Sequence, residues 1–462
     1  MSDAPPPTSP DLRRRPKPAT NFAARRMLVS TVAITAIIAF AVLAWTALRD
    51  DDGGAFGGLS NWKEIAIVDR RSGDVVVLDA EGHPDHTLIG LGPVDETHVV
   101  GNRLALVGSS QIVITGGDGE ATTTAIDRTS SITPIRTDDG LFLVVGRPAG
   151  GDVRIVDVRT GDLLDIGALA GQTDPFLFAE TIRWAADGSA FAVGDAASFQ
   201  TIVVRPGVDE ASFFPSQPVA VSNDRVATSQ IVDRQADIGL FDYERDSKAR
   251  VPTEIPAGGV MDGDDLIVVS TAGTISRVTG GASEAERVGA VTVPSGGTVI
   301  SVDPTADGER LVVTGDVFQA VIDLEGTTIF STTFTSPITV RRPDPSWSCL
   351  PVGGDGSFHS LVVVETGEQI ADLSGVEVTG ASSDGCTVIG ERAGITEVIG
   401  ADGSVDIGRA KSATLGPDGR TVVRTGTAGD TELLRIDDEL ALTDPVDITA
   451  WVTPNAIVTF LD

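Results

Sequence analysis

Residues 299–330 read VISVDPTADGERLVVTGDVFQAVIDLEGTTIF, which is four short apolar segments separated by turns. Val, Ile and Phe are frequent in these segments, and such residues favour β-strands. The turns contain Asp-Gly and Glu-Gly pairs, which are typical of tight connections. Because four strands of this size cannot bury their own faces, the stretch predicts one unit of a stacked repeat.

Related hairpins recur along most of the chain. They begin near residues 65, 112, 153, 201, 238, 274, 318, 358, 395 and 431, at intervals of 36–48 residues. This spacing is typical of a four-stranded propeller blade, and near-continuous apolar strands suit sheets covered on both faces. The sequence therefore predicts an all-β propeller of four-stranded blades, with ten as the best count and seven to ten as the range.

The two ends of the repeat region predict how the ring closes. The first unit starts with an outer hairpin at 65–78, with no inner strands before it, and residues 447–460 supply two strands and stop. We expect these N- and C-terminal strands to complete one blade together, because closure removes exposed sheet edges.

The region before the repeats predicts a membrane anchor. Residues 1–26 are basic and Pro-rich, as in a disordered cytoplasmic tail, and residues 27–48 are 22 uncharged residues, enough for a transmembrane helix. Residues 49–60 then form a linker to an extracytoplasmic propeller at 61–462, because basic residues precede the helix and acidic ones follow it. The alternative is a cleaved signal peptide, but its apolar core would be shorter, and Trp45 fits a cleavage site poorly.

The charge of the chain excludes one class of partner. The formal net charge is −32, and the first 26 residues carry a local charge of +4, so the remainder carries −36. Such a surface repels phosphate backbones, which excludes nucleic acid as a partner. The acidity is explained by the solubility of a large exported domain.

The two cysteines, Cys349 and Cys386, lie 37 residues apart, which is one repeat period. Outside the membrane a disulfide persists, so we predict one between them. The alternative is two small buried residues, because sequence does not show the distance between their Cα atoms.

Metal and cofactor motifs are weak in this sequence. His83 and His86 flank Pro84 and Asp85, which gives ligand types at close spacing, but no third ligand is evident in the sequence. We interpret this motif as a polar turn and predict no metal and no cofactor. The Asp-Gly turns lack the alternating oxygen ligands of a calcium loop.

Catalytic motifs are also missing, since the sequence has no nucleophile elbow, P-loop or His-Glu-x-x-His. Asp303, Asp384 and Asp418 fall at comparable strand ends, where a propeller can gather carboxylates at its axis. We favour turn residues on the rim. Three tryptophans precede the second strand of their units and serve either as packing residues or as a binding rim: Trp184, Trp347 and Trp451.

The basic Pro-rich tail, single apolar segment, acidic linker and outward-facing propeller resemble actinobacterial membrane-anchored periplasmic propeller proteins of the PgfA type from mycobacteria. The resemblance lies in layout, and no functional residue is transferred through it. It implies a partnership with the exporter of a mycolate glycolipid and a role in envelope growth.

The expected function is a single-pass cell-membrane protein, non-catalytic, whose periplasmic propeller binds or scaffolds envelope proteins or lipids, in the setting of mycolate glycolipid trafficking. The alternative is an extracytoplasmic hydrolase of glycan or lipid with axial carboxylates. An apolar axial pocket favours lipid binding, whereas a pair of carboxyl groups in a central cleft favours hydrolysis.

Overall fold

The computed structural model describes residues 62–461, apart from 89, 91, 117–120, 138–139, 173–174, 233–234, 245–246, 306–308, 334–347, 355–356 and 444. The chain divides into residues 1–54 and 55–462, and the described residues all belong to the second unit. The predicted tail, membrane helix and linker lie outside the described residues. Among the described residues, no helix is both long and apolar enough to cross a membrane.

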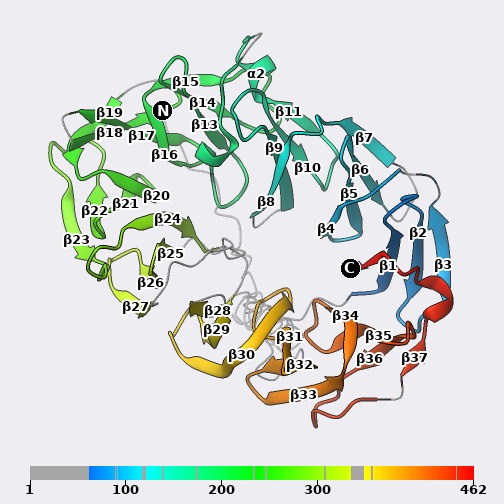
Figure 1. The fold of residues 1–462 in the computed structure, drawn as a ribbon. Coiled ribbons are helices and arrows are strands. Elements are labelled where there is room, and N and C mark those ends of the chain that lie inside the picture. Colours follow the sequence, from blue (N-terminus) through cyan, green and yellow to red (C-terminus); the bar gives the residue numbers. More distant parts are fainter. Residues whose placement is uncertain are drawn as a thin grey trace, which may run out of the picture. The chain divides into compact units, whose positions relative to one another are not determined.

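The described chain is almost entirely antiparallel β-structure, in nine sheets that follow one another in sequence order (Figure 1). The first four sheets, each written from its inner strand outward, are β38 (Ala456–Leu461), β1 (Glu64–Asp69), β2 (Val75–Asp79), β3 (Pro84–Leu88); β4 (Glu96–Val100), β5 (Arg103–Val107), β6 (Gln111–Gly116), β7 (Ala121–Ala125); β8 (Ser131–Thr137), β9 (Gly140–Gly146), β10 (Val153–Asp157), β11 (Leu163–Asp165); and β12 (Arg183–Trp184), β13 (Phe191–Asp195), β14 (Gln200–Val204), β15 (Ser212–Pro215).

The remaining five sheets are β16 (Gln217–Val221), β17 (Arg225–Val232), β18 (Gln235–Asp242), β19 (Ser247–Thr253); β20 (Pro256–Asp262), β21 (Asp265–Ser270), β22 (Thr274–Val278), β23 (Glu286–Ala290); β24 (Val299–Pro304), β25 (Arg310–Gly315), β26 (Phe318–Asp323), β27 (Thr328–Thr333); β28 (Cys349–Gly354), β29 (Ser357–Val363), β30 (Gln369–Ala381), β31 (Val388–Arg392), β32 (Ile395–Gly400), β33 (Gly403–Gly408); and β34 (Ala410–Leu415), β35 (Thr421–Gly426), β36 (Thr431–Arg435), β37 (Val446–Asp447). Three short helices complete the described elements: α2 (Ile166–Leu169), η1 (Ala179–Thr181) and η2 (Thr449–Trp451).

The stretch that predicted the repeat forms one complete sheet, β24 to β27. Its two middle strands, β25 and β26, are almost wholly buried, whereas the outer strand β27 alternates between exposed and half-buried residues. The prediction of an all-β repeat of four-stranded units is confirmed.

The number of units depends on how β30 is treated. Its N-terminal half pairs with β29 and its C-terminal half with β31, so one 13-residue strand joins two repeats into a six-stranded sheet. The described residues therefore form nine sheets, and dividing β30 between its two repeats gives ten units. Both counts fall within the predicted range.

The closing sheet combines both ends of the repeat region, as predicted, but the predicted division of its strands is wrong. Strand β38 pairs with β1 along six residues and is the only strand that the C-terminal end contributes to this described sheet, whereas β1, β2 and β3 come from the N-terminal end. The hairpin at 65–78 is thus the middle pair of strands, not the outer pair. The sequence PDHTL of β3 is polar and largely exposed, so it gave no apolar strand signal.

The core is distributed between the sheets. Ten clusters of buried apolar residues lie in the described part, and each joins consecutive repeats. One contains Ile65, Val423 and Phe460, and it packs the ninth sheet against the first. Inner strands of neighbouring sheets also contact one another, as β38 does with β4 and β20 with β24. The sheets therefore form a closed circular order within this unit.

Candidate functional site

Two cavities lie along the inner strands of the fourth to seventh sheets. The first cavity has a volume of about 400 Å³ and follows β12, β16, β20 and β24 toward their C-terminal ends and the turns after them. The second cavity has a volume of about 530 Å³ and lies at the N-terminal ends of β16 and β20. Both volumes are in the range of small-molecule sites.

The first cavity presents an indole and several carboxylates. Trp184 comes from β12, Asp187, Asp224 and Asp264 come from the turns that follow three inner strands, and Asp303 lies on β24. The side chain of Asp303 is buried and accepts a hydrogen bond of 3.0 Å from Ser301 Oγ. Carboxylates and an aromatic ring in one concave site are groups that bind hydroxyl-rich or cationic ligands.

Arg225 forms ion pairs with two of the aspartates that line the first cavity. Its guanidinium lies 2.5 Å from a carboxylate oxygen of Asp264 and 3.9 Å from one of Asp224. Asp224 in turn accepts a hydrogen bond of 2.8 Å from Ser222 Oγ. These contacts bind the turn of the fifth sheet to that of the sixth, so the carboxylates are held on a fixed scaffold.

Tyr243 stabilises the same turn, which contains Ser222 and Asp224. Its hydroxyl donates a hydrogen bond to the Ser222 carbonyl, and the guanidinium of Arg205 stacks 4.6 Å from its ring centre. Burial raises the pKa of Tyr243 well above its usual value, with smaller contributions from Asp224 and Asp187. The phenol therefore stays neutral at any ordinary pH and acts as a hydrogen-bond donor.

The second cavity is mainly apolar, and none of its lining residues is acidic. Phe199 and Ile231 lie at its surface with 73% and 59% of their areas exposed, and Pro218, Val219 and Pro256 contribute further apolar walls. Exposed aromatic and branched side chains around a cavity are typical of a binding site for an apolar group.

One polar atom in the second cavity has no partner. Ser229 is only 8% exposed, and its Oγ forms no hydrogen bond with another described residue. A buried hydroxyl without a partner costs about 1–3 kcal/mol. Because this hydroxyl oxygen is closed to solvent, it is a local cost to stability and not a contact for a molecule in the cavity.

The two cavities are neighbours, since both are lined by Arg183 and Ala257. Arg183 donates a hydrogen bond of 2.8 Å to the carbonyl of Ile182. The result is a site with an acidic, aromatic part and an apolar part on either side of one arginine.

The predicted tryptophan rim is not assembled by the described residues. Trp184 lines the first cavity, whereas Trp451 lies in η2, between the outer strand β37 and the inner strand β38. Trp347 lies outside the described residues. Sequence reasoning missed Phe199 and Ile231, because nothing in their local sequence distinguishes a cavity wall from a core residue.

Two of the three aspartates that were candidates for axial carboxylates are bound within their own turns. Asp384 accepts hydrogen bonds from Ser382 Oγ and the Cys386 N–H, and Asp418 accepts them from the N–H groups of Arg420 and Thr421. These aspartates stabilise their own turns, as the preferred interpretation predicted. Of the three, Asp303 lines the first cavity, and the other two line neither of the cavities described above.

The predicted disulfide is confirmed. Cys349 at the start of β28 is bonded to Cys386, which precedes β31, with their Cα atoms 4.8 Å apart. The bond therefore connects the two repeats that share β30. The disulfide lines neither cavity, so its role is structural.

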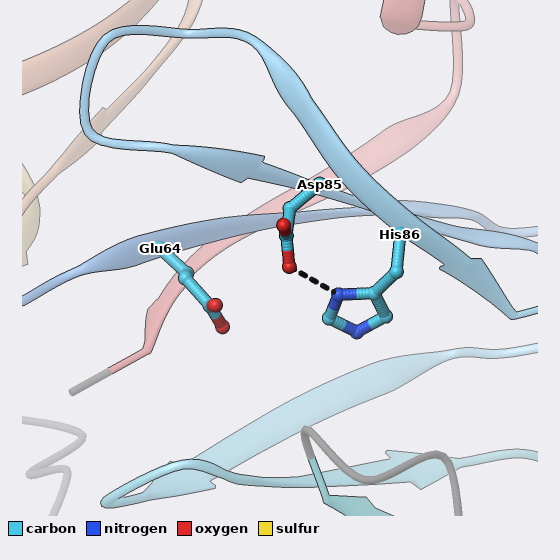
Figure 2. Close-up of side chains that lie close together, drawn as sticks. All are labelled: Glu64, Asp85 and His86. Atoms are coloured by element: carbon cyan, nitrogen blue, oxygen red, sulfur yellow. Dashed lines mark hydrogen bonds and ion pairs between the residues drawn. The ribbon is translucent and has the colours of Figure 1, made fainter.

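The two histidines of the His-Pro-Asp-His motif have different settings. His83 lies in the turn before β3, where its Nδ1 is 3.5 Å from Asp79 Oδ2, and it fits the predicted polar turn. Asp85 and His86 instead lie on β3, where Glu64 of β1 comes close to them (Figure 2). The structure thus supplies the third potential ligand that was not evident in the sequence.

A buried histidine lies elsewhere, on β4. His98 Nε2 is 3.6 Å from Glu96 Oε2 and forms no hydrogen bond with another described residue. Burial lowers the pKa of His98 more than the nearby Glu96 raises it, so the imidazole is neutral at physiological pH.

No protein-family model matches this chain, and no curated protein has a significantly similar sequence. Solved structures with a similar course of the chain include a eukaryotic initiation factor, at 9% identity and a TM-score of 0.43, with 87% of this chain and 98% of that chain covered. Others are the C-terminal WD40 domain of Sif2, at 13% identity, TM-score 0.37 and 73% and 93% coverage, and the Pan2 WD40 domain of Neurospora crassa, at 15%, 0.30, and 53% and 80%. At these scores the similarities carry no argument about this chain.

Proposed function

We propose that this protein is a non-catalytic, membrane-tethered propeller that binds an envelope glycolipid. In this proposal the sugar lies in the first cavity and the hydrocarbon chain lies in the second. The observation that carries the proposal is the junction of an acidic, aromatic cavity with an apolar one at Arg183 and Ala257.

Each part of the site suits one half of such a ligand. Sugars offer hydroxyl donors to carboxylates such as Asp187 and an apolar ring face to an indole such as Trp184. A hydrocarbon chain removes the exposed surfaces of Phe199 and Ile231 from water, at about 25 cal/mol per Å².

The membrane setting remains part of the proposal. The apolar segment 27–48 would hold the propeller near the outer face of the membrane, where a lipid leaves an exporter. We therefore propose a membrane protein complex, such as a mycolate glycolipid exporter, as the partner. Cross-linking of the full chain in native membranes, followed by identification of the partners, tests this; recovery of no envelope transport protein contradicts it.

Binding to the cavities is tested with the full chain in detergent and two probes that share one acyl chain, a free fatty acid and a trehalose ester. Phe199→Asn and Ile231→Thr should weaken both probes about tenfold, because each removes apolar contact area. Asn tolerates the left-handed backbone at Phe199, where φ is 53°. Asp187→Asn should weaken only the trehalose ester.

The matched control is Leu163→Ser, which alters an exposed apolar residue on β11 that lines neither cavity. This variant should bind both probes as the unaltered chain does. Equal losses in the control and the cavity variants, or no binding of either probe, would refute the proposed function.

A further inference from the structure

A cluster of three potential metal ligands lies in the closing sheet, away from both cavities. Glu64 is the first residue of β1, and Asp85 and His86 are consecutive residues of β3 (Figure 2). One ligand atom from each side chain lies within 4.8 Å of the other two. His86 Nδ1 and Asp85 Oδ2 are 3.0 Å apart.

An irregularity in the strand pairing brings the two consecutive residues together. His86 pairs with Val77 and Pro84 pairs with Leu78, so Asp85 is an extra residue in β3. Consecutive side chains of a regular strand point to opposite faces, whereas a β-bulge re-aims them. Figure 2 shows Asp85 and His86 turned toward each other and Glu64 approaching from β1.

The charges of the cluster favour the binding of a cation. Two carboxylates converge on one imidazole, and the Glu64 carboxylate has no hydrogen-bond or ion-pair partner among the described residues. Like charges held this close repel one another unless a positive charge lies between them. A divalent ion would neutralise both carboxylates and would take a lone pair from the imidazole.

The donor set indicates the class of metal. Imidazole suits zinc and its first-row neighbours, and Zn²⁺ binds nitrogen and carboxylate oxygen at about 2.0–2.2 Å. Two ligands at that distance from one ion are about 3–4.4 Å apart, so only a small inward movement of these side chains is needed. Asp85 is 60% exposed and His86 26%, which leaves an open side for entry of the ion and for water as a fourth ligand.

We propose that Glu64, Asp85 and His86 form a binding site for a divalent transition-metal ion of the Zn²⁺ class. The ion joins β3 to β1 across β2 in the sheet that β38 completes. Because it binds the folded sheet and not the unfolded chain, it stabilises this sheet by mass action. This site is independent of the glycolipid proposal, since none of the three residues lines a cavity.

The proposal is tested on the full chain without an affinity tag, after removal of metals by a chelator. Equilibrium dialysis against Zn²⁺ should show one site, and Co²⁺ should give visible absorption bands from bound metal. His86→Ala and Glu64→Gln should each weaken Zn²⁺ binding at least about tenfold.

His83→Ala is the matched control, because His83 belongs to the same motif but lies in the turn before β3 and outside the cluster. It should bind Zn²⁺ like the unaltered chain. Thermal unfolding separates binding from folding: the metal-free variants should unfold with the metal-free parent, and Zn²⁺ should raise the midpoint of the parent and of His83→Ala only. No binding at 100-micromolar Zn²⁺ (on the order of the weakest metal sites), or equal loss in all three variants, overturns the proposal.

Discussion

Trp62 connects the beginning of the described chain to the last sheet. Its Nε1 donates a hydrogen bond of 2.8 Å to Asp418 Oδ2, and its ring packs edge-on against Phe460 with the ring centres 5.1 Å apart. Asp418 also caps its own turn, so one carboxylate serves both the turn and the closure. Trp62 therefore stabilises closure through a polar and an apolar contact.

Trp62→Phe should lower the free energy of unfolding by about 1–2 kcal/mol, because it keeps the ring contact and removes a hydrogen bond to a charged group. For a unit of this size the unfolding midpoint should fall by about 2 °C. Scanning calorimetry measures it. Trp451→Phe is the control, since the Trp451 side chain is partly exposed and makes no hydrogen bond among the described residues; an equal shift in both variants contradicts the assignment.

Asp69 makes a second contact across the closure. Thr453 Oγ1 donates a hydrogen bond of 2.8 Å to it, and the N–H groups of Ser72 and Arg71 donate two more. These hydrogen bonds lower the pKa of Asp69 to about 2. The Ser72 N–H has the largest effect, followed by the Thr453 hydroxyl and then the Arg71 N–H. A lowered pKa means that this stabilisation is present above the ordinary value near 4 and is lost as pH falls through about 2.

Thr453→Val should raise the pKa of Asp69, because the hydroxyl that stabilises the carboxylate is removed while the shape is kept. Titration of carboxyl carbon shifts by NMR measures the change. Asp447 is the internal control: hydrogen bonds from Thr449 lower its pKa, and Thr453 takes no part in them. A shift of both aspartates would show a general rearrangement instead.

Strand β30 and the disulfide act on the same pair of repeats. The strand passes from one repeat into the next without a turn, and the Cys349–Cys386 bond closes a loop with a sequence separation of 37 residues around it. In the chain-entropy account, closing a loop of this length in the unfolded chain stabilises the fold by about 4 kcal/mol. These two repeats are thus joined three ways: by the strand, by the sulfurs and by the apolar cluster around Leu373.

Replacing both cysteines with Ala should lower the free energy of unfolding by about 2–4 kcal/mol while leaving the strand pairing intact. Chemical unfolding followed by tryptophan fluorescence measures the loss, and circular dichroism checks the strands. Reduction of the unaltered chain should reproduce the effect. If the reduced and oxidised chains unfold alike, the bond adds nothing to stability.

The sequence alone predicts features that depend on neighbouring residues or on the repeat period. The strands of 299–330 follow from alternating turns and apolar runs, and the pairing of Cys349 with Cys386 follows from one repeat period. The split of the closing sheet was mispredicted because polar β3 carries no apolar pattern. The cavities depend on turns from four sheets, and Glu64 meets His86 across an intervening strand, so neither arrangement has a signal in linear spacing.

For the propeller as a whole, closure depends on one strand. Strand β38 covers the edge of β1, whose residues from Ile65 to Val68 are fully or almost fully buried, and it also contacts β4 of the next sheet. An uncovered apolar edge pairs with other chains. The contribution of β38 is therefore to solubility as well as to stability.

Deletion of residues 456–462 should convert the protein from its native oligomeric state to large aggregates, because it exposes the β1 edge. Size-exclusion chromatography with light scattering measures this. Deletion of Asp462 alone leaves the pairing of Leu461 with Glu64 in place and should behave like the parent chain. A soluble truncated chain of unchanged size would show that closure by β38 is dispensable.

Because the closing sheet combines strands from both ends of the repeat region, its strands are synthesised at different times. Of the described strands, β1 is made first and its partner β38 last, roughly 390 residues later, which at a synthesis rate of about 5–20 residues per second is on the order of 20–80 s. Throughout that interval the earliest sheet is incomplete and its apolar edge is available to any strand nearby. The edge of β1 therefore needs protection in the nascent chain until β38 has been made.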